Sequence, residues 1–251
     1  MIGLIDWRKP AAEFLGTAFL LTAIVGSGIM AERLSGGNSA VALLANAVAT
    51  GAALFALIHI FGPISGAHFN PAVTLALALA RETPREHVLP YVLAQLGGAV
   101  AGVWIAHLMF DLPILQTSAH TRTGVGQWTG EIVATCGLLA VIASGKRHFA
   151  SALPSAIAMY IVAAYWFTSS TSFANPAVTM ARSLTDTFAG IAPANVTGFI
   201  IAQALGAGAG LLVARMLGFR YAFSTTGSGR SQMGPCAKAR SAQQFEKPSD
   251  V

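Results

Sequence analysis

The sequence predicts an all-α membrane protein in which six transmembrane helices and two re-entrant half-helices form an inverted repeat. Three observations support this prediction: an apolar composition, six long apolar stretches, and motifs that occur twice. Hydrophobic residues make up 54% of the 251 residues and charged residues 10%, with a mean hydropathy of +0.62. A soluble globular domain has about 25% charged residues, and one this apolar would expose large apolar patches. The composition therefore excludes a soluble enzyme, a disordered chain and a nucleic-acid-binding module.

Six stretches are long and apolar enough to cross a bilayer, which takes about 20 residues. They span residues 11–31, 40–61, 88–110, 128–145, 152–168 and 191–217. The first is longer than the apolar region of a usual signal peptide, and Ile29-Met30-Ala31 is a poor cleavage sequence. We therefore expect it to remain as a membrane anchor. From Tyr221 the composition changes to Ser, Gly, Lys and Gln, which predicts a flexible tail over 221–251.

The basic residues predict the topology. With six spans both termini lie on one side of the membrane, and twelve of the 15 basic residues fall on that side. The twelve are Arg8, Lys9, Arg81, Arg85, Lys146, Arg147, Arg215, Arg220, Arg230, Lys238, Arg240 and Lys247. Arg33, Arg122 and Arg182 fall on the other side. Because Lys and Arg are retained in cytoplasmic loops, we expect both termini in the cytoplasm and the protein in the inner membrane.

Three motifs recur in the same order, 105 to 118 residues apart. The pairs are Glu13-Phe-Leu-Gly-Thr17 with Glu131-Ile-Val-Ala-Thr135, Asn70-Pro-Ala-Val-Thr74 with Asn175-Pro-Ala-Val-Thr179, and Ala94-Gln95 with Ala202-Gln203. The chain thus divides into halves at about 10–110 and 128–218, each with three spans. Because three is odd, the second half is inverted relative to the first, and such folds place the substrate path between the halves. Glycine pairs, Gly98 with Gly102 and Gly206 with Gly210, predict close helix packing.

The two Asn-Pro-Ala segments predict half-helices. Asn70 and Asn175 are suited to cap a helix, and Pro71 and Pro176 are suited to its first position. Each apolar run that follows, beginning with Ala72 or Ala177, has only about seven to ten residues and cannot cross a bilayer. The inverted symmetry brings the two helix N-termini together near the membrane centre. Their partial positive charges would repel cations and protons there, and the two Asn amides would donate to a passing oxygen.

These features together resemble the aquaporin (major intrinsic protein) family over residues 10 to 220. The resemblance is carried by the six inverted spans, by Ser65-Gly66-Ala67-His68-Phe69-Asn70-Pro71-Ala72-Val73-Thr74 and by Asn175-Pro176-Ala177. It implies a channel domain over 1–220 and a homotetramer with one passive pore per subunit. It also implies that Glu13 and Glu131 are buried carboxylates that brace the half-helix loops. His68 is then a supporting residue that borders the cytoplasmic vestibule.

The chain departs from the family at the selectivity filter. Members normally have Arg directly after the second Asn-Pro-Ala, where this chain has Val178. Family spacing assigns Thr50 to the filter position that carries Phe in water channels and Trp in glycerol channels. The remaining positions fall on Ala163, or Ala164 if the loop is one residue shorter, and on Ser172 or Phe173.

Val178 removes a permanent charge and five donors, so we expect a wider and more apolar filter. Arg182 lies one helical turn further on the same face; it either replaces the missing charge or faces solvent, and we expect the second. Within the family, Val178 and the run Phe173-Ala174-Asn175-Pro176-Ala177-Val178-Thr179 resemble bacterial aquaporins associated with arsenic resistance. This implies passage of arsenous acid or methylated arsenicals, with glycerol and water as further solutes.

The alternative function is a proton-coupled secondary transporter, because many transporters also have inverted repeats. It requires a titratable group on the path, for which Glu13 and Glu131 are the candidates. We find no metal-ligand spacing, nucleotide loop or nucleophile constellation, so we expect neither enzyme activity nor a cofactor or metal. Cys136 is expected to be a small core residue, and Cys236 a reduced cytoplasmic thiol.

Overall fold

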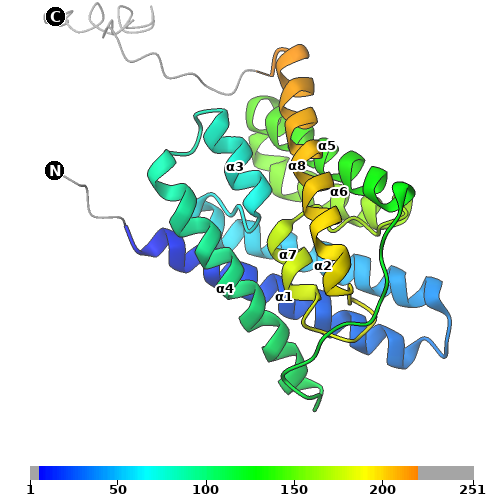
Figure 1. The fold of residues 1–251 in the computed structure, drawn as a ribbon. Coiled ribbons are helices and arrows are strands. Elements are labelled where there is room, and N and C mark those ends of the chain that lie inside the picture. Colours follow the sequence, from blue (N-terminus) through cyan, green and yellow to red (C-terminus); the bar gives the residue numbers. More distant parts are fainter. Residues whose placement is uncertain (1–5, 220–251) are drawn as a thin grey trace, which may run out of the picture.

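The computed structural model describes residues 6–219, which form eight α-helices and one 3-10 turn (Figure 1). In chain order these are α1 (Arg8–Leu34), α2 (Ser39–Ser65), α3 (Pro71–Leu79), α4 (Arg85–Met109), α5 (Val125–His148), η1 (Ala150–Ala152), α6 (Leu153–Phe167), α7 (Pro176–Arg182) and α8 (Pro193–Met216). The predicted tail 221–251, with Cys236, lies outside the described residues.

Six helices are long and apolar enough to cross a membrane, namely α1, α2, α4, α5, α6 together with η1, and α8. The six predicted spans and the all-helical fold class are therefore confirmed. Several helices extend beyond the predicted apolar stretches. Their ends carry polar residues, which the apolar pattern does not include. Large apolar side chains such as Phe19, Leu93 and Trp166 are exposed on the outer surface, as expected for helices in contact with lipid.

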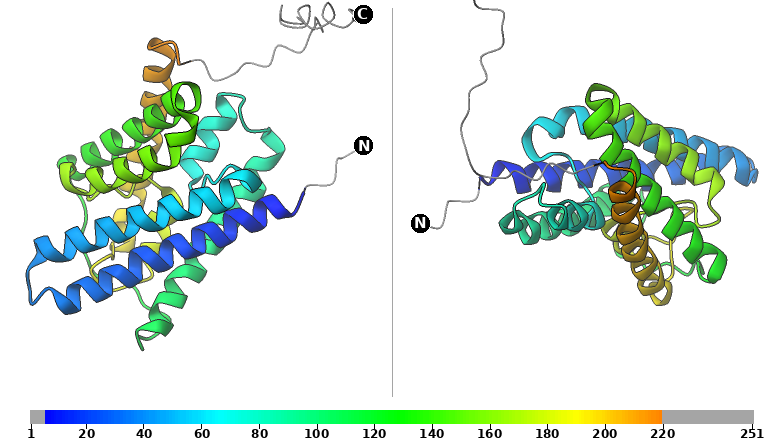
Figure 2. Two further views of the ribbon diagram at one scale, coloured as in Figure 1. Left: turned by 180° about the vertical axis from the view of Figure 1, so that it is seen from behind. Right: turned by 90° about the horizontal axis from the view of Figure 1, so that it is seen from above.

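The helices of the two halves pack in the same way. Helix α1 packs against α2 and α4, and α5 packs against α6 and α8. Figure 1 and the reverse view in Figure 2 both show α1 and α2 side by side as a long pair. The short helices α3 and α7 contact each other in the interior and also pack against α4 and α8. This is the predicted inverted repeat, with the two half-helices between its halves.

The glycine pairs allow the closest helix contacts. A Cβ atom at Gly98 or Gly102 of α4 would overlap the backbone carbonyls of Phe14 and Ala18 in α1. The pair Gly206 and Gly210 of α8 meets the carbonyls of Ile132 and Cys136 in α5 in the same manner. The prediction that these glycines serve helix packing is confirmed, because any side chain there would force the backbones apart.

Candidate functional site

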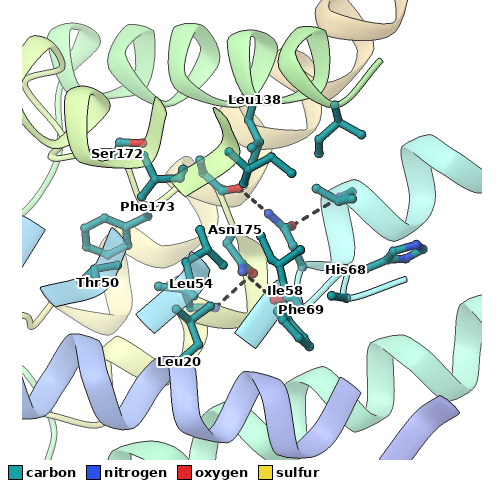
Figure 3. A pocket seen from close by; sticks show the side chains of 18 of the residues that line it. Leu20, Thr50, Leu54, Ile58, His68, Phe69, Leu138, Ser172, Phe173 and Asn175 are labelled. Carbon is teal, nitrogen blue, oxygen red and sulfur yellow. Dashed lines mark hydrogen bonds between the residues drawn. The ribbon is translucent and has the colours of Figure 1, made fainter. Parts of the chain in front are cut away.

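Asn70 and Asn175 lie opposite each other at the starts of α3 and α7. The Oδ1 atom of each accepts backbone N–H groups of its own helix, Ala72 and Val73 for Asn70, and Ala177 and Val178 for Asn175. The Nδ2 atom of Asn70 donates to the Ala174 carbonyl at 2.7 Å, and that of Asn175 donates to the Phe69 carbonyl at 2.8 Å (Figure 3). Each amide nitrogen carries two hydrogens, so one on each remains available beside the cavity described below.

The loops before the two half-helices have matching, unusual backbones. Ala67 and Phe69 in the first loop have φ of +50°, and Ser172 and Ala174 in the second have φ of +48° and +47°. The left-handed region is unfavourable for residues with a side chain, by roughly 1–2 kcal/mol each. The loops therefore need strong bonds from their surroundings to hold this shape.

Glu13 and Glu131 supply those bonds. Both side chains are fully buried. The Glu13 carboxylate accepts the backbone N–H groups of His68 and Phe69 at 2.9 and 2.7 Å. The Glu131 carboxylate accepts those of Phe173 and Ala174, both at 2.8 Å. Neither carboxylate lines the cavity, so both contribute through the loops that they hold.

Two glutamines take part in the same networks, and sequence reasoning gave them no role. Gln95 donates to Glu13 at 2.7 Å and to Thr74 at 2.9 Å. Gln203 donates to Glu131 at 2.7 Å and to Thr179 at 2.8 Å. Both glutamines belong to the repeated Ala-Gln motif, and their equivalent positions in the two halves are the signal from which a shared role could have been inferred.

A cavity passes between the two halves, along the facing asparagines. Its wall is largely apolar, and its polar members gather at the centre and at the ends. The lining residues used below are Thr50, His68, Asn70, Lys146, Tyr165, Ser172, Phe173, Asn175, Val178 and Arg182. Figure 3 shows Thr50, Ser172 and Phe173 on one side of Asn175 and His68 on the other.

The predicted filter residues gather at one end of this cavity, with one exception. Thr50, Phe173 and Val178 line it, but Ala163 is exposed on the outer surface of α6 and does not. The alternative, Ala164, is fully buried and is also absent from the lining. In their place Tyr165 lines the cavity and donates its hydroxyl to Thr50 Oγ1 at 3.3 Å.

Arg182 faces the cavity, so the expectation that it faces solvent is wrong. It is 2% exposed, and its Nε donates to the Ala189 carbonyl. The loop after α7 folds back over it, with the Ile191 N–H bonded to the Arg182 carbonyl at 3.2 Å. The carbon of its guanidinium lies 3.5 Å from the centre of the Phe173 ring, a cation–π contact. We refer to this part of the cavity as the Arg182 end.

A second arginine stands behind the same ring. The guanidinium carbon of Arg122 lies 5.3 Å from the Phe173 ring centre. Its Nε donates to the Gly190 carbonyl at 2.8 Å, and NH2 donates to the Phe188 carbonyl at 3.3 Å. Burial lowers the pKa of the Arg122 guanidinium from its usual range. The Arg182 end therefore has two positive charges around one aromatic ring.

The opposite end of the cavity contains His68 and Lys146. His68 Nδ1 lies 3.1 Å from Thr74 Oγ1, inside the network of Glu13. Lys146 lies 2.5 Å from the Glu82 carboxylate in an ion pair between α5 and the loop after α3. His68 thus supports the first loop and borders one mouth of the cavity.

Several other polar side chains of the helices are placed away from the cavity. Cys136 is half-buried and does not line it. His59 and His107 bond nearby backbone carbonyls, those of Phe55 and Ile114. Within residues 6–219, no three His, Cys, Asp or Glu side chains are grouped to hold a metal ion.

Comparison with known proteins agrees with the fold. The family model described as "Major intrinsic protein" matches residues 3–148. The aquaglyceroporin AqpS of Rhizobium meliloti is 54% identical over 210 residues, covering 84% of this chain and 90% of the relative. The lens fiber major intrinsic protein of Gallus gallus is 36% identical over 127 residues, covering 49% of this chain and 47% of the relative. The structure of an aquaglyceroporin from Plasmodium falciparum superposes with a TM-score of 0.66 at 20% identity, covering 83% of this chain and 95% of that one.

The chain therefore belongs to the major intrinsic protein family. The last of these matches shows the shared fold. Members of the family are multi-pass membrane channels rather than enzymes, and this chain is a passive channel for small solutes.

Proposed function

We propose that the protein is an aquaglyceroporin-type pore that conducts small uncharged solutes, among them glycerol, arsenous acid and methylated arsenicals, and excludes ions. The N-termini of α3 and α7 meet at the centre of the path, and each has a partial positive charge. A cation there would lose its hydration and meet two repelling dipoles. An uncharged solute loses less hydration and finds the free amide hydrogens of Asn70 and Asn175.

The observation that carries this proposal is the placement of Glu13 and Glu131. Proton coupling needs a titratable carboxylate that reaches the path. Both carboxylates are fully buried, both are absent from the cavity wall, and each oxygen accepts at least one hydrogen bond. This favours a passive pore over the proton-coupled transporter that the inverted repeat also allowed.

Val178 supports the passage of solutes larger than water. Its side chain lines the cavity together with Asn175 and Arg182, so at this position the wall is apolar and carries a short side chain. We further propose that the protein is a homotetramer in the cytoplasmic membrane with both termini in the cytoplasm, so that Lys146 lies at the cytoplasmic mouth. The channel domain then covers residues 1–220, with inverted halves at about 10–110 and 128–218.

Stopped-flow light scattering on proteoliposomes tests the proposal. Protein-containing and empty vesicles are compared for water, glycerol and arsenous acid, with and without a pH gradient. We expect fast flux of the two larger solutes that does not saturate and does not follow the gradient. Saturable flux driven by a pH gradient would instead favour the transporter, and flux of water alone would contradict the wide filter.

A further inference from the structure

Two buried polar groups at the Arg182 end have unused hydrogen-bond donors. Arg182 is 2% exposed, Ser172 is 3% exposed, and both line the cavity. Among the residues that the structure describes, only Nε of the three guanidinium nitrogens has an acceptor, the Ala189 carbonyl. Ser172 Oγ has no hydrogen-bond partner within residues 6–219. Buried polar groups are nearly always hydrogen-bonded, so an oxygen-bearing molecule in the cavity would satisfy both.

The guanidinium is held in position before any solute arrives. Its central carbon lies over the Phe173 ring, 3.5 Å from the ring centre. That ring packs edge-on against Phe199, with the ring centres 5.1 Å apart. The Phe173 N–H is bonded to Glu131 at 2.8 Å. The ring and the backbone of Phe173 are both held in place. The guanidinium beside this ring therefore loses little conformational freedom when a solute binds.

The charges around this end favour oxygen atoms over cations. Arg122 lies against the same ring, but its Nε and NH2 are bonded to the carbonyls of Gly190 and Phe188. The Glu131 carboxylate is enclosed behind the loop and does not face the cavity. Two positive charges therefore act on a molecule in this space, and Arg182 and Ser172 both have donors that are free to reach it.

Val178 makes this arrangement possible. It precedes Arg182 by four residues, one turn of α7, and both line the cavity. A long side chain at position 178 would occupy the space into which the Arg182 guanidinium extends. Because Val178 is short, the positive charge at this end comes from Arg182, one helical turn after the position where family members have arginine.

We propose that Arg182 and Ser172 form a binding site for an uncharged solute with two neighbouring oxygen atoms, a polyol or a neutral oxyacid, and that this site sets the selectivity of the pore. The paired N–H groups of a guanidinium match two adjacent acceptors. A solute such as urea has one acceptor oxygen and four N–H hydrogens, which find no acceptor on Arg182. The inference builds on the proposed function and names the solute class that it prefers.

The test compares glycerol with urea in proteoliposomes. Arg182→Met keeps the length of the side chain and removes its donors. We expect the glycerol-to-urea permeability ratio to fall about five- to tenfold, since one or two hydrogen bonds are lost. Arg33→Met is the matched control, because Arg33 also donates to a backbone carbonyl and lies over an aromatic ring, both of Phe110, but is outside the cavity. Its ratio should equal that of the wild type.

A second variant decides the question if Arg182→Met does not fold. Ser172→Ala removes one donor and is compatible with the backbone, because Ala67 holds the same conformation in the first loop. We expect its glycerol-to-urea ratio to fall about two- to threefold. An unchanged ratio in folded Arg182→Met, or in Ser172→Ala if the first variant fails to fold, overturns the site. Wild-type protein that passes neither solute faster than empty vesicles would overturn the proposed function as well.

Discussion

Asn70 and Asn175 cross-link the two halves of the molecule, because each donates its side-chain amide to the carbonyl immediately before the other. The donor–acceptor distances are 2.7 Å to Ala174 and 2.8 Å to Phe69. The same two side chains also cap α3 and α7. Each asparagine side chain thus caps one half-helix, bonds the loop of the other half and has a further N–H donor beside the cavity.

Asn175→Asp should weaken the fold and the barrier against cations. The replacement oxygen cannot donate to the Phe69 carbonyl, and it places a negative charge between the helix N-termini. We expect a loss of about 1–3 kcal/mol in the free energy of unfolding and a measurable sodium leak in proteoliposomes. Asn38→Asp is the control, since Asn38 only caps α2. Equal behaviour of the two variants would contradict the role of the cross-link.

Val178→Arg should restrict large solutes more than water. The new side chain would enter a cavity that already contains Arg182, and both size and charge would narrow it. We expect glycerol flux to fall at least about tenfold, with a smaller loss of water flux, measured by stopped-flow light scattering. Val178→Thr, which keeps the size, should leave both rates near those of the wild type. Equal losses for water and glycerol in the Arg variant would show that position 178 is not in the filter.

Glu13→Gln should reduce the amount of folded protein without changing the driving force for transport. The carboxylate accepts four hydrogen bonds, from Ser65, His68, Phe69 and Gln95. An amide there turns its own N–H groups toward some of these donors, at a cost of about 2–4 kcal/mol in the free energy of unfolding.

The measurements for this variant are yield after size-exclusion chromatography and flux per folded molecule. Glu32→Gln is the control, since Glu32 is exposed. A stable Glu13→Gln protein that loses only pH-driven flux would instead support the transporter.

Gly206→Ala should lower thermal stability, and Gly208→Ala on the same helix should not. A Cβ at Gly206 would overlap the Ile132 carbonyl of α5, whereas one at Gly208 meets no atom within 4 Å. We expect a decrease of about 1–3 kcal/mol in the free energy of unfolding for the first variant. The second should gain slightly, because alanine favours the helix by about 0.5–1 kcal/mol. The unfolding temperature in detergent measures both, and similar values would contradict the close packing of α5 and α8.

The fold could be predicted from the sequence because long apolar stretches recur along the chain and the main motifs occur twice. Length and apolar character located six spans, and each copy of Asn-Pro-Ala supported the other. Cap, first-turn proline and short apolar run are local properties of the chain. They therefore show in the sequence where each half-helix begins, although the surrounding helices are needed to stabilise it.

The filter was harder to predict because it depends on helix rotation and on a returning loop. Counting by family spacing pointed to Ala163, but the cavity-facing side of α6 presents Ile161 and Tyr165, four residues apart. Adjacent residues on a helix point about 100° apart, so an error of one or two positions changes the face. Arg182 was expected in solvent because no local pattern shows that the loop after α7 covers it and bonds it through Ala189.

The cross-link between the halves also has a consequence for biosynthesis. The acceptor for the Asn70 amide is the carbonyl of a residue 104 positions later in the chain. While a ribosome is still making the second half, α3 has its cap but lacks the opposing loop. The Asn70 amide therefore has no acceptor at Ala174, and the centre of the path stays incomplete, until residue 174 has been synthesised and has taken its place.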